Sequence, residues 1–215
     1  MPSHSQTTEQ HPTPNIPPSS AILHVSSSIL INSPIETVWS TLTDTSTYPS
    51  WNHFIPRVTI RSQPNATPTS RSLRQGTKFT FHANMYPEKH EDPQPDKGGL
   101  NETFLEVIEY SPPTPDYSTS ATGSGGEGKR KGRIVWASDP SAGGFITWFL
   151  TAERVHELEE VVGDDGRVVV EVRNWESQVG CLAYVVRWLF GGRLRDNFGY
   201  WERGLKDFSE SRTQE

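Results

Sequence analysis

Cysteine is almost absent from the sequence, since Cys181 is the only one among 215 residues. The chain therefore cannot form an internal disulfide bond or a zinc site built from several cysteines, and a reducing, cytoplasmic location is expected. The first residues contain neither a basic segment nor an apolar run, so the sequence predicts no signal peptide. Apolar runs stay below the length of about 18 residues that a membrane-spanning helix requires, so no transmembrane segment is predicted.

Basic residues are also in deficit, with 20 Lys and Arg against 26 Asp and Glu and a formal net charge of −6. Such a chain creates no field that attracts phosphate backbones, so we expect no nucleic-acid partner. The glycines at 123–128 lie in a low-complexity tract without a strand and helix around them, which excludes a dinucleotide-binding fingerprint. P-loop, HExxH and GxSxG motifs are missing, so the sequence predicts neither a cofactor nor a metal site.

The overall composition is polar, with 33% hydrophobic residues, yet seven Trp and nine Phe are present. Disordered chains seldom contain so many aromatic residues, so an aromatic core diluted by polar tracts is expected. Residues 1–20 hold five prolines and little apolar bulk, which predicts a disordered tail. Polar tracts at 86–99 and 111–131 are predicted loop insertions, so one domain is expected over residues 21–211.

Periodicity predicts one strand, two short helices, about six antiparallel strands and one long helix, an α+β arrangement. The first helix should be capped by Ser33 and begin near Pro34. The strands are expected at 22–31, 57–62, 76–85, 102–110, 133–138, 145–161 and 167–177. The last helix is expected over 182–211, with an interruption at Gly191 and Gly192. Its apolar stripe follows steps of four and three: Leu194, Phe198, Trp201, Leu205 and Phe208.

The stretch SSSILINSPIETVWSTLTDTSTYPSWNHFIPRVTI, residues 26–60, resembles the opening of the START-like (SRPBCC) helix-grip superfamily. Further similar stretches are GTKFTF at 76–81, FLEVIEYSPP at 104–113, GRIVW at 132–136, RVHELEEV at 154–161 and WERGLKDFSE at 201–210. The superfamily includes polyketide cyclases/dehydrases, coenzyme Q-binding START-like proteins and Bet v 1-like proteins. The resemblance implies a helix-grip fold, in which a seven-stranded antiparallel sheet curls around a long C-terminal helix after two short helices. It also implies a cavity for a hydrophobic small molecule.

Strand alternation indicates which polar side chains face this cavity. Glu153, Glu157 and Glu159 share one face, which is assigned to water, so Arg154 and His156 face inward. On the next strand, the same argument places Asn174 and Glu176 inside. A turn at 163–166 makes the numbers of paired residues sum to 330, which sets Arg154 opposite Glu176 and His156 opposite Asn174.

These four residues form a predicted polar ladder with two open interpretations. In the first, the ladder recognises a polar end of the ligand, with His156, Arg154 and Glu176 as candidate catalytic residues. In the second, Arg154 and Glu176 form a structural ion pair, and His156 only bonds Asn174.

Aromatic side chains on inward-facing positions are candidate ligand-binding residues, with core packing as the alternative. Together with Asn174, the set is Phe79, Phe81, Trp136, Trp148, Phe198 and Trp201. The same alternation places His82 on the outer, surface side.

The function implied is binding of a hydrophobic, aromatic or polyketide-like small molecule in an internal cavity. Whether the protein is an enzyme stays open. If so, it is a cofactor-free cyclase or dehydratase, and the alternative is a non-catalytic carrier of a lipid or quinone. The run at 182–190, followed by Arg193 and Arg195, fits contact with a membrane surface through 182–195, or packing over the sheet edge.

Overall fold

The structure, a computed structural model, describes residues 11–64, 70–87, 100–115, 129–143 and 148–213. Seven strands form the sheet: β1 (Leu23–Ile31), β2 (Arg57–Ser62), β3 (Lys78–Ala83), β4 (Asn101–Pro115), β5 (Arg130–Ser138), β6 (Thr151–Val162) and β7 (Val168–Val179). The helices comprise α1 (Ile35–Thr43), α2 (Tyr48–Trp51) and the long α4 (Cys181–Thr213), with 3-10 turns η1 (Pro18–Ser20) and η4 (Pro140–Ala142).

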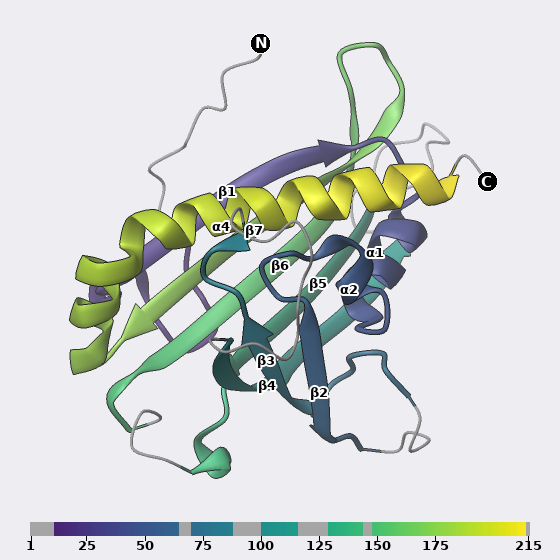
Figure 1. Cartoon of the computed structure of the whole chain (residues 1–215). Coiled ribbons are helices and arrows are strands. Elements are labelled where there is room, and N and C mark those ends of the chain that lie inside the picture. The colour runs from purple at the N-terminus through teal and green to yellow at the C-terminus, as the bar shows by residue number, and fades with distance from the viewer. Residues whose placement is uncertain (1–10, 65–69, 88–99, 116–128, 144–147, 214–215) are drawn as a thin grey trace.

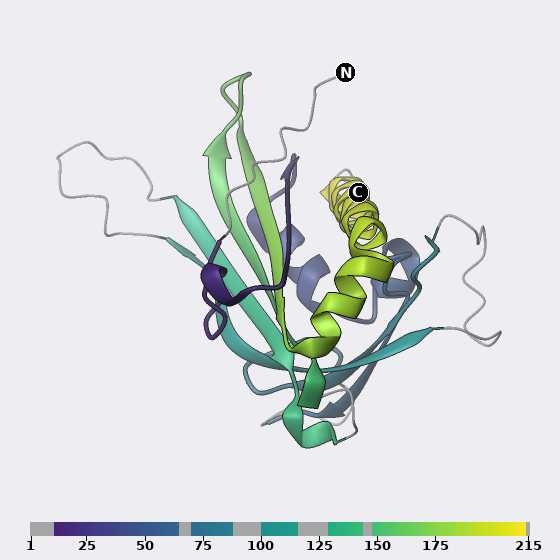
Figure 2. The ribbon, with the colours of Figure 1, turned by 90° about the vertical axis from the view of Figure 1, so that its left-hand side faces the viewer.

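The sheet is antiparallel throughout and runs in the order β1-β7-β6-β5-β4-β3-β2. It curls around one side of α4, and α1 and α2 lie at the end of the molecule where α4 terminates (Figure 1, Figure 2). This arrangement confirms the predicted α+β helix-grip fold. The apolar stripe of α4 and the inner face of the strands form the main core.

The connection between β1 and α1 does not have the predicted cap. Pro34 is the N-cap of α1, and its carbonyl accepts from the backbone N–H groups of Thr37 and Val38. The Ser33 hydroxyl instead donates to the carbonyl of Ser209 (3.1 Å) and contacts the hydroxyl of Thr213. Ser33 therefore fastens the end of α4 to this connection, a contact that local sequence cannot reveal.

Helix α4 is continuous through Gly191 and Gly192, which corrects the predicted interruption, although its first turns lie at an angle to the rest (Figure 1). A third glycine on this helix has a packing role. A Cβ on Gly204 would lie 2.3 Å from the carbonyl oxygen of Trp51, so only glycine lets α2 approach α4 this closely. The approach brings the rings of Trp51 and Trp201 to 6.1 Å.

The described part of the predicted tail, residues 11–20, is ordered against the outer face of the sheet. Trp175 Nε1 donates to the carbonyl of Pro12 (3.1 Å), and Ile16 is buried. Asn15 donates from its backbone N–H and its side chain to the two carboxylate oxygens of Glu153, at 2.9 and 2.6 Å. Figure 2 shows this purple segment on the side of the sheet away from α4.

The coverage by residues 11–20 corrects the assignment of Glu153 to water. The side chain is 2% exposed, because the segment replaces solvent over this part of the outer face. Its two carboxylate oxygens accept hydrogen bonds from Asn15, which meets the requirement that a buried charge be hydrogen-bonded. Residues 1–10 lie outside the described residues.

The strand boundaries differ from prediction in two places. Within the predicted loop of 111–131, β4 continues to Pro115 and β5 begins at Arg130, while 116–128 lie outside the described residues. The predicted strand over 145–161 begins only at Thr151, and Trp148 and Phe149 are helical. Of the predicted loop over 86–99, the residues 88–99 lie outside the described residues.

Candidate functional site

The predicted register of β6 and β7 is confirmed. His156 lies opposite Asn174, Leu158 opposite Val172, and Arg154 opposite Glu176. A shift by one residue would turn the valines of β7 toward water, so the burial pattern allows only this pairing. The pairing brings the side chains of Arg154, His156 and Asn174 to the inner face, where each is at most 4% exposed.

Arg154 is a buried cation held by an amide and an aromatic ring. Its Nε donates to Asn174 Oδ1 (2.9 Å), and its guanidinium carbon lies 4.0 Å from the centroid of the Phe198 ring. Burial lowers the pKa of Arg154 to about 10, against the attraction of Glu176, Tyr48 and Glu202, so the side chain stays charged near neutral pH. Its Nη2 has no hydrogen-bond partner among the described residues.

The imidazole of His156 lies between two tryptophans. Its ring centroid is 4.2 Å from that of Trp136 and 4.9 Å from that of Trp201. Burial, helped by the charge of Arg154, lowers the pKa of His156 well below its usual value, so the ring is neutral at physiological pH. Neither ring nitrogen has a hydrogen-bond partner within the described part of the chain, so the predicted bond to Asn174 is wrong.

Glu176 does not complete the predicted ladder. Although its backbone is paired with that of Arg154, no ion pair joins the two side chains in the described structure. Its carboxylate accepts instead from Gln178 Nε2 (2.6 Å), and its side chain is only partly buried. The predicted Arg154–Glu176 ion pair is therefore corrected, and Asn174 is the partner that Arg154 contacts.

Glu202 is a residue of the same interior that the sequence did not single out. It lies on α4 directly after Trp201, is 6% exposed, and has one carboxyl oxygen without a partner among the described residues. Burial raises the pKa of Glu202 to about 7, against the lowering by Ser27, Arg154 and Arg203. The available signal was its spacing, because position 202 is one helical turn after Phe198 and therefore on the apolar face.

Aromatic rings surround this group of polar side chains. Phe79 (β3), Phe81 (β3), Trp136 (β5), Phe198 (α4) and Trp201 (α4) are each at most 4% exposed, as the alternation predicts. The ring of Trp136 meets the rings of Phe79 and Phe81 edge to face, with centroid distances of 6.1 and 5.6 Å. These rings are in mutual contact, so they pack the core as well as enclose Arg154 and His156.

One sequence expectation about orientation and one about exposure are wrong. Trp148 is 84% exposed, because the chain at this point precedes β6 and does not follow its alternation. His82 does lie on the outer face but is buried, because Arg57 and Thr59 of the neighbouring strand contact its two ring nitrogens at 3.1 and 2.9 Å.

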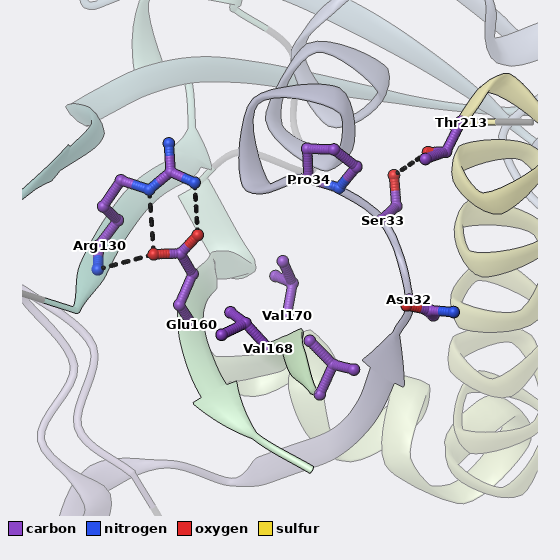
Figure 3. A pocket seen from close by; sticks show the side chains of 9 residues that line it. Asn32, Ser33, Pro34, Arg130, Glu160, Val168, Val170 and Thr213 are labelled. Carbon is purple, nitrogen blue, oxygen red and sulfur yellow. Dashed lines mark hydrogen bonds and ion pairs between the residues drawn. The ribbon is translucent and has the colours of Figure 1, made fainter. Parts of the chain in front are cut away.

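A pocket of about 300 Å³ opens where α4 ends, and it includes none of the predicted site residues. Figure 3 shows four of its polar side chains in two pairs, Arg130 with Glu160 and Ser33 with Thr213. It is separated from His156 by the buried pair of Leu158 and Val172. Because these four polar side chains are already paired, the pocket is a weaker candidate for recognition than the buried group around His156.

Within the described ranges, the structure brings no three His, Cys, Asp or Glu residues into a metal-binding group. None of the helices in that part of the chain is both long and apolar enough to cross a membrane.

Comparison with known proteins adds three findings. The sequence profile of a family described as polyketide cyclase / dehydrase and lipid transport matches residues 23–172. The chain is 43% identical over 187 residues to "Oxopyrrolidines biosynthesis cluster protein O" of Penicillium oxalicum, covering 85% of this chain and 84% of that protein. A solved structure of a hypothetical protein from Helicobacter pylori is similar, with a TM-score of 0.61, 14% identity, and 96% and 99% of the two chains covered.

A second solved structure with a similar fold is the di-domain ARO/CYC protein StfQ of the steffimycin biosynthetic pathway. It has a TM-score of 0.51 and 12% identity, and the match covers 92% of this chain and 53% of that one. At these identities, the two structures support the fold and do not assign an activity.

Proposed function

The chain belongs to the polyketide cyclase / dehydrase and lipid transport family, and on that premise we propose that it binds a hydrophobic, polyketide-like small molecule between the sheet and α4. We propose further that it acts on this molecule as a cofactor-free cyclase or dehydratase. The curated relative from Penicillium oxalicum is named for a biosynthesis cluster, which supports a biosynthetic rather than a structural role.

One observation supports this proposal most strongly. Arg154 Nη2, both nitrogens of His156 and Glu202 Oε1 are buried without hydrogen-bond partners among the described residues, and aromatic rings contact Arg154 and His156. Each such atom destabilises the native state by about 1–3 kcal/mol. A ligand with an apolar body and one oxygen-rich end would contact the rings and satisfy these atoms, so the site favours that chemical class.

The three polar side chains have complementary properties for chemistry at a carbonyl group. The Arg154 cation would bind a carbonyl oxygen and stabilise the negative charge of the enolate. Neutral His156 or ionised Glu202 would accept a proton from the adjacent carbon, and the enolate carbon would then bond to a second carbonyl carbon. The protonated base would return its proton to the resulting alkoxide, which becomes a hydroxyl group. In the dehydration, neutral His156 would remove the second proton of the same carbon while protonated Glu202 donates a proton to the hydroxyl, which leaves as water as a carbon–carbon double bond forms. The pKa of Glu202, raised by burial to about 7, allows both of its protonation states near neutral pH.

The experiment uses a synthetic poly-β-ketone thioester as the probe, with loss of one water followed by mass spectrometry. We expect His156→Gln and Glu202→Gln each to lower turnover by about 10²-fold or more, the usual size of an acid–base contribution. Binding of a hydroxynaphthoquinone, measured by tryptophan quenching, should change less than about threefold in both variants. His82→Gln, a buried histidine on the outer face, is the matched control and should retain full turnover.

The carrier function remains the alternative, because the aromatic rings would hold a lipid or quinone without any reaction. In that case, no probe would be turned over, and native mass spectrometry would find a small molecule that copurifies and is released by Trp201→Ala. If folded His156→Gln and Glu202→Gln turn over the thioester like the wild type, the enzymatic proposal is refuted. Oleate serves as the lipid probe in the same tryptophan-quenching measurement. If neither the hydroxynaphthoquinone nor oleate binds and no small molecule copurifies, the ligand-binding proposal fails as well.

A further inference from the structure

The seven tryptophans fall into two groups with very different surroundings. Trp39, Trp51, Trp136, Trp175 and Trp201 are each at most 7% exposed, whereas Trp148 is 84% and Trp188 is 83% exposed. A nearly fully exposed tryptophan is unfavourable in water, and two of them at one end of a molecule mark an interaction surface.

The two exposed tryptophans belong to one apolar surface at the beginning of α4. Tyr184, Val185, Trp188 and Leu189 project from the exposed side of the helix, which lies opposite its buried stripe. The chain before β6 meets the start of this helix at Gly180, where a Cβ would lie 2.3 Å from the Phe149 carbonyl oxygen. Trp148, the residue before Phe149, therefore borders the same surface, which we call the aromatic end.

The aromatic end lies far from the end of the molecule where α1 and α2 pack on the last turns of α4 (Figure 1). Its residues are separate from the buried group around His156, which is enclosed by β5, β6 and the middle of α4. The inference below is thus independent of the proposed reaction and of the identity of the ligand.

Charge near the aromatic end differs from that of the whole protein. The chain has a net charge of −6, yet residues 178–195 contain three arginines and no Asp or Glu, and residues 140–152 contain no charged residue. Arg187 and Arg195 are exposed, and Arg195 follows Trp188 by two helical turns on the same side of α4. The guanidinium carbon of Arg193 lies 4.6 Å from the ring centroid of Tyr86.

From this combination we propose that the aromatic end binds the surface of an anionic lipid bilayer. Tryptophan and tyrosine rings partition into the interface between headgroups and acyl chains, and leucine and valine extend the buried apolar area. The local cationic charge complements the negative lipid headgroups, while the acidic remainder of the protein stays in water.

Flotation of the full chain with vesicles tests the proposal. Vesicles of phosphatidylcholine alone are compared with vesicles that contain about 30% phosphatidylserine, at low and high salt. We expect binding to the anionic vesicles, a blue shift of tryptophan emission, and weaker binding at high salt. Trp188→Ser should lower vesicle affinity at least about tenfold, from the loss of one large apolar side chain. Arg195→Gln should lower it roughly fivefold.

Leu30→Ser, which removes an exposed apolar side chain of β1 away from the aromatic end, is the matched control and should bind like the wild type. All three substituted side chains are exposed, so the thermal unfolding temperature of each variant should equal that of the wild type. Equal binding of Trp188→Ser and wild type, or no binding to anionic vesicles, would overturn the proposal. So would a dimer, seen by light scattering, that Trp188→Ser converts to a monomer, since the surface would then join two copies of the chain.

Discussion

The stability of the protein should depend on pH through Glu202, and the variant Glu202→Gln isolates that dependence. The carboxyl is 6% exposed, and burial raises its pKa from 4.5 to about 7. Between these two values, the folded protein binds a proton that the unfolded chain has already released. The stabilisation linked to this proton is fully present below pH 4.5 and is lost as the pH rises through 7.

The interval between the two pKa values corresponds to about 3 kcal/mol of unfolding free energy. Glu202→Gln has no proton to lose, so its stability relative to the wild type should rise by about this amount between pH 4.5 and pH 8.5. His156 contributes with the opposite sign, because its lowered pKa makes the folded state less stable as the pH falls below 6.5. That contribution is present in both proteins and cancels in the difference.

The measurement is urea unfolding followed by tryptophan fluorescence at several pH values, with stabilities obtained by linear extrapolation. Glu202→Met, of similar volume, is the matched control for packing. It should differ from Glu202→Gln in absolute stability but show the same change with pH. If the difference from the wild type varies by less than about 0.5 kcal/mol over this range, the carboxyl is not shifted. Its proposed role in proton transfer would then lose its physical basis.

Three further predictions concern packing and charge, each checked by denaturant unfolding. Gly204→Ala should destabilise the protein by about 1–3 kcal/mol through steric conflict, whereas Gly192→Ala, which meets no neighbouring atom, should stabilise it by up to about 1 kcal/mol. Asn15→Ala should cost about 1–3 kcal/mol, because Oε1 of the buried Glu153 carboxylate loses its side-chain donor while the backbone N–H of residue 15 still donates to Oε2, and an unchanged stability would contradict the docking of residues 11–20. Burial raises the pKa of Asp139, but hydrogen bonds from its neighbours outweigh this effect and lower the pKa to about 2. About 2 kcal/mol of unfolding free energy, present above pH 4, should therefore be lost as the pH falls toward 2. This dependence on pH should be missing in Asp139→Asn.

The register of the β6–β7 hairpin could be predicted because two local signals agree. The turn at 163–166 fixes which residues pair, and the alternation of valine with charged residues fixes which face is buried. Arg154, His156 and Asn174 followed from these signals, and the structure gives them the predicted pairing and burial. The contact between Arg154 and Asn174, in place of Glu176, depends on side-chain positions that backbone pairing does not specify.

The remaining differences come from contacts between segments far apart in the chain. Alternation assigns a strand residue to one of two faces, but it cannot say what covers the outer face, so the burial of Glu153 was missed. The prolines of residues 1–20 indicate low helix and strand propensity. They carry no information about docking on Trp175, which lies more than 150 residues later.

The sequence by itself determined the order of the strands and helices, the helix-grip fold and the inward direction of the polar residues on β6. The element order and the inward direction follow from periodicity and turn residues, which act over short distances along the chain, whereas the helix-grip fold follows from the resemblance of the motifs to the START-like superfamily. Only the tertiary structure decided which buried polar atoms lie without partners, that Glu202 joins them from α4, and that Trp148 and Trp188 share an exposed end. Such properties arise when α4 closes over the sheet, because burial and charge depend on all neighbours in space.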